Sequence, residues 1–153
     1  MGNYARLEVD FVERTLKLIK QYDRLKGQFP FDEQYDHTLL INAMLGLIIL
    51  PKEKSLSYIP KERLAFVKVL NEWGINRTWF NEDLKNTTEL LKRLRNSVAH
   101  FDIEFMSETP ENHIDLIRFV DKEAGMHVAT FQASELRLFI EYYANLLIRN
   151  MQR

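Results

Sequence analysis

The segment KRLRNSVAHFDIEF, Lys92 to Phe105, decides the fold because its hydrophobic period changes at His100. Upstream of His100, core-type positions recur at alternating spacings of three and four, as they do on the inner face of an amphipathic helix. These positions are Leu84, Thr87, Leu91, Leu94 and Val98. Downstream of His100, Phe101, Ile103 and Phe105 alternate with charged residues, which is the period of a strand. The segment therefore predicts a helix that is followed directly by a β-strand.

Helical patterns also lie upstream of this segment. From about Ala5 to Leu25, apolar residues recur at helical intervals, and Gly27 and Pro30 end the pattern. Nearer the segment itself, Asn81 or Asp83 is expected to cap the helix that contains RNSVAH, because short polar side chains accept hydrogen bonds from the first helical N–H groups.

Between these two helices the sequence predicts two more. The apolar stretch LLINAMLGLIIL, residues 39–50, is expected to form a buried helix with Asp32 as its N-cap and with Pro51 as its end. A further helix is expected from Pro60 to Gly74, since proline suits a first helical position and glycine suits the C′ position.

The last third of the chain predicts a hairpin and a final helix. The runs HIDLIRFV and MHVATFQA flank the turn-like sequence DKEAG, in which Gly125 supplies the unusual φ. Ser134 is expected to cap a last helix. Its inward residues are Leu136, Phe139, Ile140, Tyr143, Leu146 and Leu147. The expected fold is mainly α: an antiparallel bundle of about five helices, with a small antiparallel β element inserted before the C-terminal helix.

Length and composition limit the kinds of protein to which this chain can belong. With 153 residues and 46% hydrophobic residues, we expect a single domain over residues 1–153. The absence of cysteine excludes disulfides, cysteine nucleophiles and thiolate zinc sites. No export signal is recognisable, and the longest apolar run is shorter than the roughly 20 residues that span a bilayer. We therefore expect a cytoplasmic protein with no membrane partner, while the net charge of −1 leaves room for a local basic patch that binds RNA.

The residues around His100 are the candidate site. At 100° per residue, Arg95 lies on the flank of the core stripe, whereas Asn96 and His100 share the opposite, solvent-facing side. On a regular helix Arg95 and His100 diverge by about 140° and about 7.5 Å of rise, so either the helix ends early or a second chain completes the site. Arginine is a permanent planar cation that grips phosphate, and histidine exchanges protons near neutrality. The pair suits phosphodiester cleavage without a metal or another cofactor.

RNSVAH resembles the signature of HEPN domains (higher eukaryotes and prokaryotes nucleotide-binding): an arginine, a polar residue, and a histidine four to six residues after the arginine. Arg95, Asn96 and His100 occupy these places, and Arg93 also falls within the permitted spacing. The apolar helix TLLINAMLGLIILPKE and the strand-turn-strand before the C-terminal helix extend the resemblance over most of the chain, toward the plasmid- and phage-defence group of HEPN nucleases.

This resemblance implies a metal-independent endoribonuclease that works as a dimer, often as a toxin with an antitoxin partner or as an effector of abortive infection. It implies catalytic roles for Arg95 and His100 and substrate-binding roles for Asn96 and Arg93. HEPN toxins that are silenced by adenylylation carry a tyrosine two places after the histidine, where this chain has Asp102, so that regulation is not expected.

Other interpretations of the same residues remain open. Arg95 suits a surface ion pair, and His100 suits a helix C-terminus where it interacts with the dipole. Lys85, Lys92 and Arg93 suit a solvated helix face. The alternative function is a non-catalytic HEPN-like module that binds RNA, a nucleotide or a protein.

Overall fold

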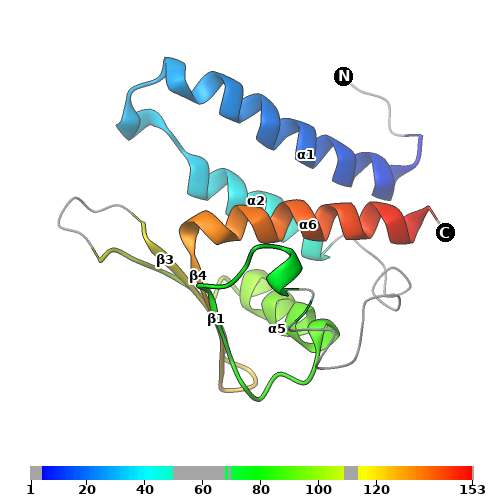
Figure 1. The fold of residues 1–153 in the computed structure, drawn as a ribbon, viewed down its shortest axis with the longest axis vertical. Coiled ribbons are helices and arrows are strands. Elements are labelled where there is room, and N and C mark those ends of the chain that lie inside the picture. The colour runs from blue at the N-terminus through cyan, green and yellow to red at the C-terminus, as the bar shows by residue number, and fades with distance from the viewer. Residues whose placement is uncertain (1–4, 50–67, 69, 109–113, 153) are drawn as a thin grey trace.

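The structure is a computed structural model that describes residues 5–49, 68, 70–108 and 114–152. In chain order its elements are α1 (Leu7–Leu25), the short 3-10 helices η1 (Lys26–Gln28) and η2 (Phe31–Glu33), α2 (Asp36–Ile49), β1 (Trp79–Phe80), α5 (Thr87–Ala99), β2 (Ile103–Met106), β3 (Leu116–Asp121), β4 (Met126–Gln132) and α6 (Ala133–Met151). The described chain is mainly α, with a small antiparallel sheet before the final helix, as the sequence predicts (Figure 1). The helix predicted from Pro60 lies largely outside the described residues.

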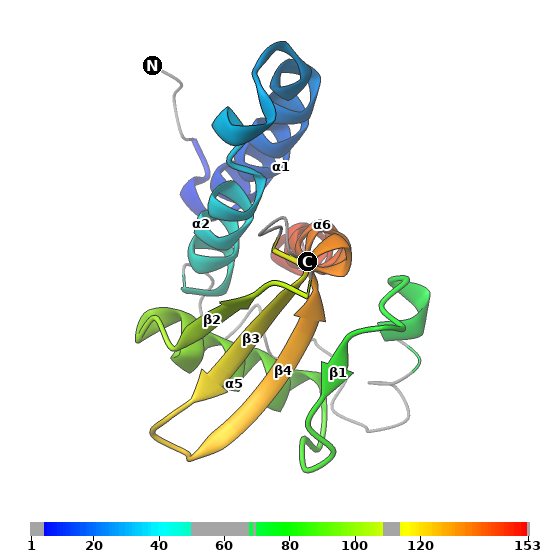
Figure 2. The ribbon, with the colours of Figure 1, turned by 90° about the vertical axis from the view of Figure 1, so that its left-hand side faces the viewer.

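The sheet has four antiparallel strands in the order β1-β4-β3-β2 (Figure 2). Its centre is the predicted hairpin, in which Asp121 pairs with Met126 and Gly125 has a φ of 62°. The strand that follows RNSVAH is β2, which pairs with β3. Strand β1 was not predicted from the sequence, because two residues are too few to show a period.

The inner face of the sheet packs on α5 and α6 through aromatic side chains. Phe119 and Phe131 are fully buried, and their ring centroids lie 5.5 Å apart. Phe131 meets Phe139 of α6 at 5.2 Å, edge to face, which is a favourable arrangement for two rings. The predicted inward residues of α6 are buried except for Leu146, which is only partly buried. This core fixes α5 and the hairpin relative to each other.

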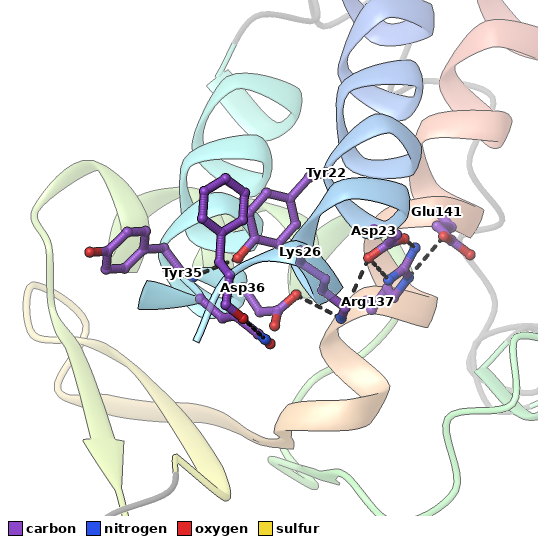
Figure 3. Close-up of polar contacts among 9 residues, drawn as sticks. Tyr22, Asp23, Lys26, Tyr35, Asp36, Arg137 and Glu141 are labelled. Atoms are coloured by element: carbon purple, nitrogen blue, oxygen red, sulfur yellow. Dashed lines mark hydrogen bonds and ion pairs between the residues drawn. The ribbon is translucent and has the colours of Figure 1, made fainter. Parts of the chain in front are cut away.

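The polar contacts in Figure 3 link α1 to α6 and the end of α1 to α2. Arg137 of α6 donates to both carboxylate oxygens of Asp23 at the end of α1, one bond being 2.7 Å long. Its Nε also donates to Glu141 at 3.1 Å. At the turn between α1 and α2, Lys26 pairs with Asp36 at 3.0 Å. Charge-assisted bonds therefore hold the α1–α2 unit against the C-terminal helix.

The N-caps predicted for α2 and α6 are wrong. Asp32 lies inside η2, and α2 begins only at Asp36. Ser134 lies within the first turn of α6, whose N-cap is Gln132 and carries no side-chain capping bond. The neighbouring Glu135 instead accepts hydrogen bonds from the chain that leads into β1, including the Thr78 N–H at 2.7 Å. Tertiary contacts thus override the local preference of serine for a cap.

The N-cap predicted for α5 is also wrong. Asn86 caps the helix, and its side chain accepts from the Glu89 N–H at 2.9 Å. Asn81 and Asp83 instead form a tight turn, in which the Asn81 side chain accepts from the Asp83 N–H and donates to the carbonyl of His127. Leu84 lies between Asn81 and Asn86, before the helix begins, and its side chain is buried in the core.

Candidate functional site

Helix α5 keeps its regular form up to the motif histidine. Its last residue is Ala99, and the C-cap His100 still has helical angles (φ −94°, ψ 0°) with its N–H on the carbonyl of Asn96 at 3.0 Å. The Phe101 N–H then donates to Val98 at 3.1 Å and the Asp102 N–H donates to Ser97 at 2.8 Å. These two bonds form a Schellman motif, which closes the helix and turns the chain into β2. The helix therefore runs up to its C-cap at His100, and an end further upstream is excluded.

A buried carboxylate joins two of the predicted site residues. Asp121, at the end of β3, is 1% exposed. Its Oδ2 accepts from Arg93 Nη1 and from Asn96 Nδ2, each at 3.1 Å, and its Oδ1 accepts from the Ala124 N–H at 3.1 Å. Burial alone raises the pKa of the Asp121 carboxyl, but these three donors together hold that pKa below its usual value. Arg93 and Asn96 are thus tied to the hairpin.

This arrangement corrects two expectations. Asn96 was expected on the solvent-facing side of α5 with His100, yet it is half-buried under the hairpin turn. Arg93 was weighed as part of a solvated face, yet its side chain is only 24% exposed and also reaches Glu89 at 3.9 Å. One helical turn of α5 therefore rests on β3 through charged and amide groups rather than facing open solvent.

Arg95 and His100 are placed differently. Arg95 lies on α5 and His100 is its C-cap, and both residues are exposed, as are Lys92 of α5 and Lys85, which precedes the helix. Within the part of the chain that the structure describes, neither the Arg95 guanidinium nor the His100 ring has a hydrogen-bond or ion-pair partner, so no described contact brings the two together. Because the helix is regular through His100, the separation of about 140° and about 7.5 Å between their directions remains. The described residues thus offer no support for Arg95 as a surface ion-pair partner.

The structural roles of three residues in this region were not predicted from the sequence. Asp121 and its neighbours were interpreted only as a hairpin turn, because its role as a buried acceptor depends on Arg93 and Asn96, which lie 28 and 25 positions away in the sequence. Asp102 pairs with Lys122 at 2.7 Å, and its carbonyl accepts from the Val120 N–H at 3.0 Å, which fastens the turn after His100 to β3. Phe101 was interpreted as a strand residue, yet it has a φ of 55° and lies in the turn itself.

Residues 5–49, 68, 70–108 and 114–152 contain no group of three or more histidine, aspartate or glutamate residues that could hold a metal ion. Among the same residues, no helix has the length and apolarity that crossing a bilayer requires.

Comparison with known families identifies the class of this protein. A helix that carries the arginine-to-histidine motif, followed by a strand and a hairpin that lead into a C-terminal helix, is the arrangement for which a HEPN relationship was expected. The family described as HEPN pEK499 p136 matches residues 1–153, so the chain belongs to this HEPN family. Searches among curated proteins and among solved structures found no significant match. Membership of the family supports a nuclease or a nucleotide-binding module.

Proposed function

We propose that this protein is a metal-independent endoribonuclease in which Arg95 and His100 act on the scissile phosphate. The observation that carries the proposal is a difference between two pairs of residues. Arg93 and Asn96 are bound to Asp121, whereas Arg95 and His100 are exposed. Exposed groups on a rigid helix are available to a substrate, and the helix fixes the position of their backbone atoms. Family membership adds the class of chemistry to which the pair belongs.

In this mechanism the nucleophile belongs to the RNA. The 2′-OH attacks the adjacent phosphorus, and His100 takes part in the proton transfers at the attacking and leaving oxygens. The Arg95 guanidinium stabilises the charge that develops on the phosphate, and the products are a 2′,3′-cyclic phosphate and a free 5′-OH. No covalent enzyme intermediate forms. A single-stranded or looped RNA is the expected substrate, because in-line attack needs a deformable backbone.

The engagement of Arg93 supports Arg95 as the working arginine. Two carboxylates already balance the charge of the Arg93 guanidinium, which weakens its attraction for a phosphate, whereas Arg95 has no such contact among the described residues. Asn96, for which the family resemblance implies substrate binding, then acts through Asp121 by keeping α5 in register with the hairpin. Any contact of Arg93 and Asn96 with RNA is secondary in this proposal.

The divergence of Arg95 and His100 supports a site that two chains build together. With a regular helix up to His100, the two side chains do not converge on one phosphate from a single chain. In a symmetric homodimer, the same patch from each chain meets across the two-fold axis, so Arg95 of one protomer can face His100 of its partner. We therefore propose a composite site in a cytoplasmic homodimer. By its family, we further propose that it serves as a toxin or defence effector controlled by an antitoxin protein.

Incubation of purified protein with cellular RNA in excess EDTA tests the chemistry. We expect cleavage that survives EDTA and leaves cyclic phosphate ends. His100→Ala and Arg95→Ala should each abolish it, while Arg149→Ala, which removes an exposed arginine from α6, should leave it unchanged. Loss of activity on chelation with recovery in Mg²⁺ would indicate a metal nuclease. Binding of RNA without any cleavage would favour the non-catalytic module.

Mixing experiments test the composite site. Wild-type protein is exchanged with an excess of His100→Ala, and heterodimers are confirmed by mass. If the two Arg95–His100 pairs line one shared cleft, a heterodimer lacks one of the two histidines of that cleft, so activity should fall well below that expected if each wild-type chain acted alone. If every wild-type chain keeps its full share of activity, the shared site is refuted.

A further inference from the structure

The residue after the motif histidine has a backbone conformation that its side chain disfavours. Phe101 has a φ of 55°, and it is the sole non-glycine residue with a positive φ among those that the structure describes. In this left-handed region the Cβ of an L-residue crowds the following carbonyl oxygen, so bulky residues are rare there. Phe101 occupies the C′ position of the Schellman motif that closes α5, where glycine is the usual residue.

The same chain contains a matched turn that follows the rule. The Gly74 N–H donates to Asn71 at 3.0 Å and the Ile75 N–H donates to Leu70 at 3.0 Å, which repeats the bonding at the end of α5. Here the C′ residue is Gly74, with a φ of 74°. Since glycine satisfies this turn at no steric cost, the phenylalanine at position 101 is not there for the turn.

Packing does not account for the phenylalanine either. Its side chain is 68% exposed, and no aromatic ring among the described residues packs on it. The strained conformation persists because the flanking backbone is fixed, since Asp102 is bound to Ser97, Val120 and Lys122. An exposed apolar ring in a strained but rigid position, one peptide bond from a motif residue, is the pattern of a residue kept for contact with a ligand.

We propose that Phe101 is a stacking platform for an RNA base next to the scissile phosphate. This inference rests on the proposed function. His100 and Phe101 are consecutive residues of one fixed turn. A base that stacks on the Phe101 ring therefore places the neighbouring phosphate within reach of the histidine. Asp102, the next residue in the chain, forms an ion pair with the exposed Lys122, and such charged surroundings of the turn fit a nucleotide better than an apolar protein surface. Stacking on an aromatic ring tolerates every base, so Phe101 selects unpaired RNA rather than a particular sequence.

The first test compares Phe101→Gly with wild type. Glycine removes both the ring and the strain, so the melting temperature should equal or exceed that of wild type. The kcat/KM for a single-stranded RNA should nevertheless fall by about fivefold or more. Phe101→Trp should retain cleavage. Phe31→Gly removes a phenylalanine with a matching exposure of 69% from η2, and it should cleave like wild type.

An abasic series then identifies the stacked base. Wild type should lose about fivefold or more on an RNA that lacks the base at one position beside the cleavage site. Phe101→Gly should show no further loss on that RNA, because the partner of the missing base is already gone. Equal cleavage by Phe101→Gly and wild type on intact RNA refutes the stacking role and leaves the ribonuclease assignment intact. Loss of the dimer in Phe101→Gly, with the abasic effect retained, makes Phe101 a contact between chains and also refutes it.

A binding measurement separates this inference from the proposed function. In the His100→Ala background, a single-stranded RNA that contains 2-aminopurine should lose fluorescence on binding, and adding Phe101→Gly should restore it. This result supports the platform even if no RNA is cleaved by wild type. Equal quenching with and without the Phe101 ring refutes it.

Discussion

Replacement of Asp121 by asparagine should destabilise the protein strongly for so small a change. The two carboxylate oxygens of Asp121 accept from opposite sides, one from the Ala124 N–H and the other from Arg93 and Asn96. An asparagine has the same shape but only one acceptor oxygen, so its NH₂ group must face either one donor or two. In addition, the charge that balances Arg93 is lost in a residue that is 1% exposed.

The structure sets the size of this effect. Hydrogen bonds to a charged group contribute about 1.5–3 kcal/mol each, and a buried donor that is left without an acceptor costs about 1–3 kcal/mol. Arg93 keeps its contact with Glu89 and is partly exposed, so solvent offsets part of the loss. We therefore expect Asp121→Asn to lower the free energy of unfolding by about 2–3 kcal/mol, which corresponds to about 4–12 °C in Tm for a domain of this size.

Urea and thermal unfolding at several pH values measure the effect. The folded-state pKa of Asp121 lies below the unfolded value of 3.8, so its ionised form stabilises the fold fully above 3.8, and this stabilisation is lost as pH falls through the folded pKa. The difference between wild type and Asp121→Asn should therefore shrink on acidification. Glu104→Gln, which removes a 57% exposed carboxylate of a surface pair with Arg118, is the control and should change stability by less than about 1 kcal/mol. An Asp121→Asn protein within about 0.5 kcal/mol of wild type at pH 7 would refute the reasoning.

Three further substitutions test the remaining contacts. Asn86→Ala removes the N-cap of α5 and should cost about 1 kcal/mol in urea unfolding, whereas Asn81→Ala tests the rejected cap and should leave the helix start unchanged by amide exchange. Asp23→Asn weakens the link from α1 to Arg137; with both side chains partly exposed, we expect a loss of about 1 kcal/mol that decreases in high salt, and a loss independent of salt would argue against an ionic link. Tyr143→Phe removes a buried hydroxyl that has no hydrogen-bond partner among the described residues, so stability should stay equal or rise by up to about 1 kcal/mol, and a clear decrease would reveal an unseen partner.

Periodicity explains which parts of the fold could be predicted from the sequence. The core stripe of α5 is visible because residues such as Leu91 and Leu94 face one side of a long helix, and burial there depends on spacing alone. The hairpin is visible because Gly125 marks its turn between two alternating runs. These signals are local, and they are repeated over several residues, so a competing contact elsewhere does not erase them.

Features that depend on one side chain could not be predicted in the same way. An asparagine, aspartate or serine caps a helix only where the backbone enters the helix in a suitable direction. At Asn81 the side chain accepts a hydrogen bond within a turn instead. The partner of Arg93 and Asn96 lies more than 20 residues further along the chain, on the far side of β2. No spacing rule within α5 points to Asp121, since only the pairing of β2 with β3 brings it there.

The two arginines illustrate the limit most clearly for function. Arg93 and Arg95 both satisfy the spacing to His100, and in the sequence only the polar Asn96 that follows Arg95 favours Arg95. They differ by about 200° around α5, so the hairpin can cover only one of them. The buried Asp121 binds Arg93, so Arg93 attaches the helix to β3. Arg95 is left exposed, close in sequence to the turn of His100 and Phe101. The contact that binds Arg93 and Asn96 to Asp121 thus fixes the backbone of α5 against β3, while the side chains of Arg95, His100 and Phe101 remain exposed.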